Sequence, residues 1–104
     1  MMVTTSSQIA GKEIKQTFGL VRGNTIRARN IGKDIMAVFK NIIGGEIEEY
    51  TKLMAESRDQ SLDRMIENAK QLGANAIVDI RFSTSYIMGS AAEILVYGTA
   101  VLIE

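Results

Sequence analysis

Two groups of charged side chains in this sequence have the types and spacing that could bind a ligand. In the first, Arg27 and Arg29 alternate along a strand-like stretch and lead into Asn30, with Lys33 three residues later. Guanidinium groups pair with phosphate or carboxylate oxygens, and a helix start presents free N–H groups to an anion. These four residues are the predicted ligand-binding site. The alternative is that the two arginines form salt bridges with acidic residues of a later helix.

The second group is acidic. Glu46, Glu48 and Glu49 lie together at the start of a long helical pattern, where three carboxylates could hold a hard divalent cation. Acidic residues are also typical of the first turn of a helix, because the helix dipole is positive there. We therefore predict no dedicated metal site and regard these glutamates as weak oxygen-ligand candidates only.

The chain contains no cysteine and no histidine among its 104 residues. It therefore has no disulfides, no thiolate nucleophile and no thiolate or imidazole ligand for zinc, copper or cadmium. Its glycines match neither a phosphate-binding loop nor a dinucleotide-binding fingerprint, and its serines and threonines have no histidine to activate them. The sequence predicts no catalytic residues, no cofactor and no enzymatic activity.

The formal charge of zero hides a division between the two halves of the chain. Residues 1–40 carry seven Lys+Arg against two acids, and residues 41–104 carry five against ten. We expect these halves to face each other, within a subunit or across an interface. Nucleic acid is not expected as the principal partner, because neutralising phosphates requires net positive charge. There is no signal peptide and no run of ~20 apolar residues, so we expect a cytoplasmic chain without a membrane partner.

Residue spacing predicts one domain over residues 1–104, of the α+β class. In chain order, the predicted elements are a short extended piece at 3–11, a strand-like stretch at 13–29, a short helix at 31–43, a long amphipathic helix at 48–72 and strands at 76–87 and 93–103. Gly23-Asn24 interrupts the first long strand as either a hairpin turn or a bulge. Gly73 is expected to end the long helix in a left-handed conformation.

Alternation along the strands predicts which residues share a face. It groups Phe18 with Leu20 in the first long strand, and Val78 with Ile80 and Phe82 in the next. The final strand is apolar on both faces. One helical layer covers only one face of a sheet, so we expect a second copy of the chain to cover the other and predict a homo-oligomer.

Arg58 is the exception in the long helix. It falls inside the apolar arc, where a guanidinium needs a paired carboxylate. Asp34 is the predicted partner, with Asp79 as the second choice. The alternative is an arginine whose stem is buried and whose head reaches water.

Several short motifs, taken together, resemble one known family. They are Thr4-Thr5-Ser6, G-x-V-x-G at 19–23, N-I-x-x-D at 30–34, GG-x-x-x-x-Y at 44–50, Arg58-Asp59, GANAIV at 73–78 and GTAV at 98–101. In this order and spacing the chain resembles the YbjQ family, small bacterial and archaeal proteins of unknown function that are often labelled heavy-metal-binding. The resemblance covers nearly the whole chain.

The resemblance implies a two-layer subunit similar to that of dodecin, with an antiparallel sheet packed against one long and one short helix, and assembly into a ring-shaped homopentamer. The heavy-metal label does not suit a chain without cysteine or histidine. We therefore predict a homo-oligomeric scaffold or interaction protein with a protein partner. The alternative is a ring that binds a small ligand or anion.

Overall fold

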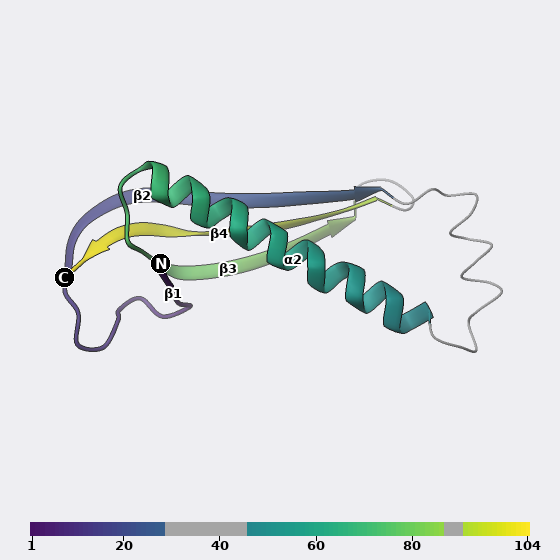
Figure 1. Cartoon of the computed structure of the whole chain (residues 1–104), viewed down its shortest axis with the longest axis horizontal. Coiled ribbons are helices and arrows are strands. Elements are labelled where there is room, and N and C mark those ends of the chain that lie inside the picture. The colour runs from purple at the N-terminus through teal and green to yellow at the C-terminus, as the bar shows by residue number, and fades with distance from the viewer. Residues whose placement is uncertain (29–45, 87–90) are drawn as a thin grey trace.

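The computed structural model describes residues 1–28, 46–86 and 91–104. Its elements are β1 (Met2–Val3), β2 (Ile14–Ala28), α2 (Glu46–Gln71), β3 (Ala76–Tyr86) and β4 (Ala91–Ile103). The strands form one sheet in the order β1-β3-β4-β2, and α2 runs obliquely across one face (Figure 1). The predicted α+β class is confirmed. The predicted short helix at 31–43 lies outside the described residues.

The sheet is mixed rather than purely antiparallel. β4 pairs antiparallel with both β2 and β3, as predicted, but β1 pairs parallel with the start of β3. Residues 4–6 extend this edge, since Thr4 N–H donates to Ile77 O and Asp79 N–H donates to Ser6 O. Beyond Ile80, the chain's N-terminal segment no longer follows β3.

Gly73 ends α2 as predicted. Its φ is +90°, its N–H donates to Lys70 O, and the N–H of Ala74 reaches back to Ala69 O, which is the Schellman arrangement. The side chain of Asn75 then exchanges two hydrogen bonds with the backbone of Ile103, of 2.9 and 2.8 Å. This turn therefore ties the end of the helix to the last strand.

Two predicted faces are wrong, because the strands contain bulges. The register of β2 shifts at Gly19, whose φ is +110°, so Phe18 packs on the same core as Val21 and Leu20 points to the opposite face. The register of β3 shifts between Val78 and Arg81, around Asp79 with φ +55°. Ile80 therefore joins the helix-side core, whereas Val78 lies on the other face.

The sheet has a small core on each face. Under α2, the buried residues are Val21, Met65, Ala69, Ala74, Ile77, Ile80, Val96 and Ala100. We call the face without α2 the open face. There Ala76, Val78, Val101 and Ile103 are buried, with Ile9 of the N-terminal segment packed against them. Here the chain itself supplies the cover, so in this part of the sheet the expected second copy is not needed.

The other half, which we call the distal half, is the end where β2 and β3 finish and β4 begins. It leaves large apolar side chains exposed on both faces: Ile26 is 56% exposed on the open face, and Phe82 (49%) and Tyr86 (75%) are exposed on the helix side. The radius of gyration is 17.3 Å, against ~13 Å for a compact domain of this size. The single chain is thus elongated and only partly covered.

Candidate functional site

Helix α2 approaches the sheet very closely at Gly23. A Cβ added to Gly23 would lie 2.1 Å from Ser61 O and 2.5 Å from Met65 N, both backbone atoms of the helix. Gly23 faces Val96 and Asn24 faces Leu95 in an unbroken ladder. The Gly23-Asn24 dipeptide is therefore neither a hairpin turn nor a bulge, and its glycine makes room for the helix.

A chain of buried hydroxyl groups fixes this contact. The Thr25 and Ser61 hydroxyls are 2.7 Å apart, and the Thr25 hydroxyl lies 3.2 Å from Ser57 O. Ser61 Oγ lies 2.9 Å from Ser57 O and 3.1 Å from Ile94 O. Thr25, Ser57 and Ser61 are all at most 3% exposed. Because buried polar groups are costly unless satisfied, this network fixes the position of α2 over β2 and β4.

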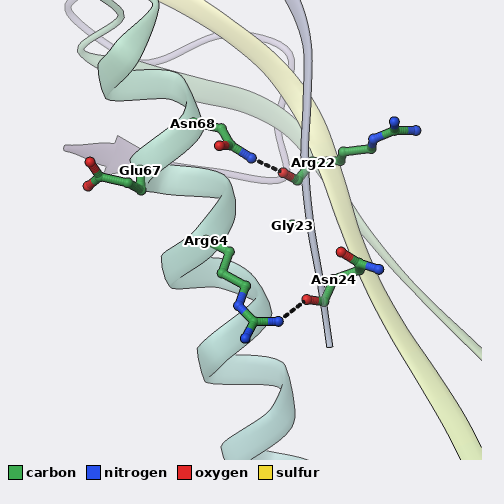
Figure 2. A pocket seen from close by; sticks show the side chains of 6 residues that line it. All are labelled: Arg22, Gly23, Asn24, Arg64, Glu67 and Asn68. Carbon is green, nitrogen blue, oxygen red and sulfur yellow. Dashed lines mark hydrogen bonds between the residues drawn. The ribbon is translucent and has the colours of Figure 1, made fainter. Parts of the chain in front are cut away.

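A surface pocket of about 330 Å³ lies where α2 passes the edge of β2 (Figure 2). Its lining includes Glu67 and two helix side chains that bind strand carbonyls: Arg64 donates to Asn24 O at 2.6 Å, and Asn68 donates to Arg22 O at 2.8 Å. Arg64 and Asn68 thereby occupy outward-facing acceptors of an edge strand. The pocket therefore lies at a joint between α2 and β2, where helix side chains satisfy part of the backbone edge of β2.

A second polar feature lies on the open face. Tyr97 faces Arg22 on one side and Arg81 on the other, so the three side chains form one row across β2, β4 and β3. Arg81 Nη1 donates to Thr5 O (2.9 Å) and Ile80 O (2.8 Å), which holds that guanidinium in place. Among the described residues, the only ion pair is Lys15–Glu13, so neither arginine has a carboxylate partner there. Arginine side chains without a carboxylate partner are candidates for binding an anion.

The predicted ligand-binding residues are mostly not described. Arg29, Asn30 and Lys33 lie outside the described residues. Arg27 lies in β2, facing Ala92 of β4, but its side chain is not described. This site stays a prediction. Sequence reasoning missed Arg22 and Arg81, which are 59 positions apart in the chain and are brought together only by their shared neighbour in β4.

Glu46, Glu48 and Glu49 lie in the first turn of α2, as predicted, but their side chains are not described. Within the part of the chain that the structure describes, no group of three or more Asp or Glu could hold a metal ion. The described helix is also too polar to cross a membrane.

The prediction of a buried Arg58 is wrong for the single chain, because its side chain is exposed. The reason is the oblique path of α2, which packs on β2 and β4 but scarcely on β3 (Figure 1). The helix residues near Arg58 that are buried instead are the small residues Ser57 and Ser61. Asp34 lies outside the described residues, so its pairing with Arg58 stays a prediction.

Comparison with known proteins identifies the family. A family model described as "Putative heavy-metal-binding" matches residues 1–104. The chain belongs to this family, YbjQ. A UPF0145 protein of Dehalococcoides mccartyi is 54% identical over 104 residues, covering all of both chains. One from Methanosarcina acetivorans is 50% identical over 103 residues, covering 99% of this chain and 97% of the relative.

A solved structure supports the YbjQ fold. The chain is similar to a protein of unknown function of the DUF74 family from Pediococcus pentosaceus, with a TM-score of 0.71 and 18% identity, covering 100% of this chain and 98% of the other. At this identity the likeness concerns the fold alone.

Several YbjQ motifs have structural roles in this chain. Thr4-Thr5-Ser6 pairs along the bulge at Asp79. In G-x-V-x-G, Gly19 forms a bulge and Gly23 admits α2. In GTAV, Gly98 leaves room for Ile77 and Ile80, since a Cβ there would lie 2.8 Å from Ile77 Cγ2. In this chain these motif residues shape the backbone and the packing of the subunit.

Proposed function

We propose that this YbjQ protein is a cytoplasmic homo-oligomer that serves as a scaffold or interaction protein, and that its assembly is the family's ring of five. No catalytic activity is part of the proposal. The observation that carries it is the distal half of the sheet, where Ile26, Phe82 and Tyr86 are exposed on two faces of one chain. Large apolar side chains left exposed together at one end of a sheet are typical of protein interfaces.

Light scattering at micromolar concentration tests the assembly. We expect a mass about five times the 11.4 kDa of the chain. The variant Tyr86→Ser should lower this mass, whereas Leu72→Ser should not. Leu72 is also apolar and exposed (47%), but it directly follows the C-terminal end of α2, which lies at the opposite end of the molecule from the distal half (Figure 1). A clean 11.4 kDa monomer for the wild-type chain would contradict the proposal.

A second candidate function is anion binding, which the Arg22–Tyr97–Arg81 row favours. Two arginines lie level with Tyr97 on the open face, one on each neighbouring strand, and the Arg81 guanidinium is already oriented by two carbonyl groups. A site that is oriented before binding loses less conformational entropy when the ligand arrives. The ligand class is a small phosphate or carboxylate.

Calorimetry with inorganic phosphate tests this second candidate. Saturable heat is expected for the wild-type protein and for Lys70→Ala, an exposed control on α2. The heat should be lost in Arg22→Ala and in Arg81→Ala. Equal heats in all four proteins, or none in the wild type, would remove the candidate.

A further inference from the structure

The two edges of the sheet are not equivalent. On β3, the Ile80 N–H donates to Thr4 O, so the backbone groups of Ile80 point away from β4. Because this direction alternates along a strand, Phe82, Thr84 and Tyr86 also direct their N–H and C=O groups outward. Among the described residues no strand pairs with this part of β3. Within the described part of the chain, this is an edge open to another chain.

The edge of β2 is occupied near Gly23 and open at its distal end. The carbonyls of Arg22 and Asn24 point outward, but Asn68 and Arg64 already occupy them. By the same alternation, Ile26 also directs its N–H and C=O groups outward, and α2 places no described hydrogen bond there. Pairing with another strand is therefore blocked near Gly23 and allowed beyond it.

The directions of the strands decide how two copies fit. β2 and β3 both run antiparallel to β4, so they run parallel to each other on opposite sides of the sheet. A second copy placed in the same orientation brings its β2 beside the first copy's β3 as a parallel pair.

The side-chain faces agree with parallel pairing. In a parallel pair, consider a residue whose backbone N–H and C=O groups bond to the adjacent strand. The residue level with it on that strand has its own N–H and C=O groups pointing away from the first strand. Phe82 and Thr84, on the helix side, would then lie level with helix-side residues such as Thr25 of the second copy. Both copies keep α2 on the same side. Antiparallel pairing would instead match Thr84 with the open-face side chain of Ile26 and place the two helices on opposite sides.

We propose that copies of this chain join head to tail, with the distal part of β3 in one copy forming a parallel ladder with the distal part of β2 in the next. This inference rests on the proposed homo-oligomer and names its interface. Each copy offers one distal edge of each kind, so a closed ring leaves neither distal edge unpaired, which an isologous pair cannot achieve. The exposed Phe82 and Tyr86 lie beside the new ladder.

Disulfide trapping tests this pairing, since the chain has no cysteine of its own. Within one copy, Ile26 and Ser85 both face Glu93, so they are two strand spacings apart. That is about 10 Å, beyond the ~7 Å limit between Cα atoms for a disulfide. Across the proposed ladder they occupy adjacent strands on the open face. The variants are Ile26→Cys with Ser85→Cys, and Ile26→Cys with Ser83→Cys for the neighbouring register.

At least one double variant should form, under mild oxidation, a covalent ladder in steps of 11.4 kDa that stops at the ring. Mixing the Ser85→Cys and Ile26→Cys single variants should give covalent dimers only. The control Asp63→Cys with Ser85→Cys, which uses an exposed position on α2, should give none. Self-linking of Ser85→Cys alone, or no linking in either register while wild-type oligomers persist, would overturn the interface. A monomeric wild type would overturn the oligomer itself.

A proline pair gives a second, independent measurement. The outward N–H of Thr84 takes no part in the subunit's own sheet, so Thr84→Pro should lower the oligomer mass while the subunit stays folded by circular dichroism. Ser83 faces Leu95 and bonds inward, so Ser83→Pro should unfold the subunit. An unchanged oligomer in Thr84→Pro at every concentration would also overturn the inference.

Discussion

Replacing Gly23 by alanine tests the contact on which the whole subunit depends. The new Cβ would lie 2.1 Å from Ser61 O and 2.5 Å from Met65 N. Both are backbone atoms in the middle of a helix, so no side chain can move aside. Helix α2 must therefore shift outward, and backbone shifts of this kind are what overpacked cores show.

The magnitude follows from what that shift disturbs. Overpacking costs ~1–3 kcal/mol. The same movement stretches the 2.7 Å bond between Thr25 and Ser61 and the two bonds from Arg64 and Asn68 to β2, each worth ~1 kcal/mol. Alanine also lowers the conformational entropy of the unfolded chain, and this effect stabilises the folded protein by only ~0.4–1 kcal/mol. We expect Gly23→Ala to lower the free energy of unfolding by about 2–4 kcal/mol.

Urea unfolding at two protein concentrations measures this loss and separates subunit stability from assembly. The matched control is Gln16→Ala, an exposed position on the same strand, which should stay within ~0.5 kcal/mol of the wild type. If Gly23→Ala leaves the midpoint unchanged or raises it, α2 does not approach β2 as closely as described, and the argument from the buried hydroxyl groups fails with it.

Three further predictions concern the same joint and the metal label. Ser61→Ala should lower the free energy of unfolding by ~1–3 kcal/mol in urea, because it removes the hydroxyl that joins Thr25 to the helix; a neutral result would show that the network contributes nothing. Arg64→Met should cost ~1 kcal/mol through the exposed Asn24 carbonyl, whereas Arg58→Met should change subunit stability by less than ~0.5 kcal/mol; the reverse order in urea would restore Arg58 as the structural charge. Calorimetry with Zn²⁺ should show no stoichiometric binding, because the chain offers neither thiolate nor imidazole; tight binding reversed by a chelator would contradict this.

The sequence predicted well where one local rule acts alone. The 3.6-residue period located α2 to within two residues at its start and one at its end, and Gly73 has the left-handed conformation expected of it. Strand β4 keeps strict alternation, with Val96 and Ala100 under the helix and Val101 on the open face. Strong periodicity and a glycine stop are local signals that tertiary contacts rarely override.

The sequence did not predict the bulges or the joint. A bulge adds one residue to a strand and reverses every later face, and Asp79 adopts a positive φ that no neighbouring residue type announces. The hydrogen bonds from Arg64 and Asn68 to the edge of β2 join residues at least 40 positions apart. The available signal was the pairing of small residues, with Gly23 in a strand and Ser57 and Ser61 four residues apart on the helix, which lets two backbones come close.

The unburied end of the sheet connects the fold to the assembly. Alternation grouped Phe82 with the apolar residues Val78 and Ile80, yet in one chain both Phe82 and Tyr86 are exposed on the helix side, because α2 scarcely reaches β3. Covering an aromatic side chain of this size contributes ~1.5–3 kcal/mol, and a domain is stable by only ~5–15 kcal/mol in total. The apolar pattern of the distal half is therefore too large to be incidental and has no local cover among the described residues. A neighbouring copy aligned on the open β3 edge would cover the side of the sheet on which these side chains stand, and the same contact would satisfy the outward N–H and C=O groups of Phe82, Thr84 and Tyr86.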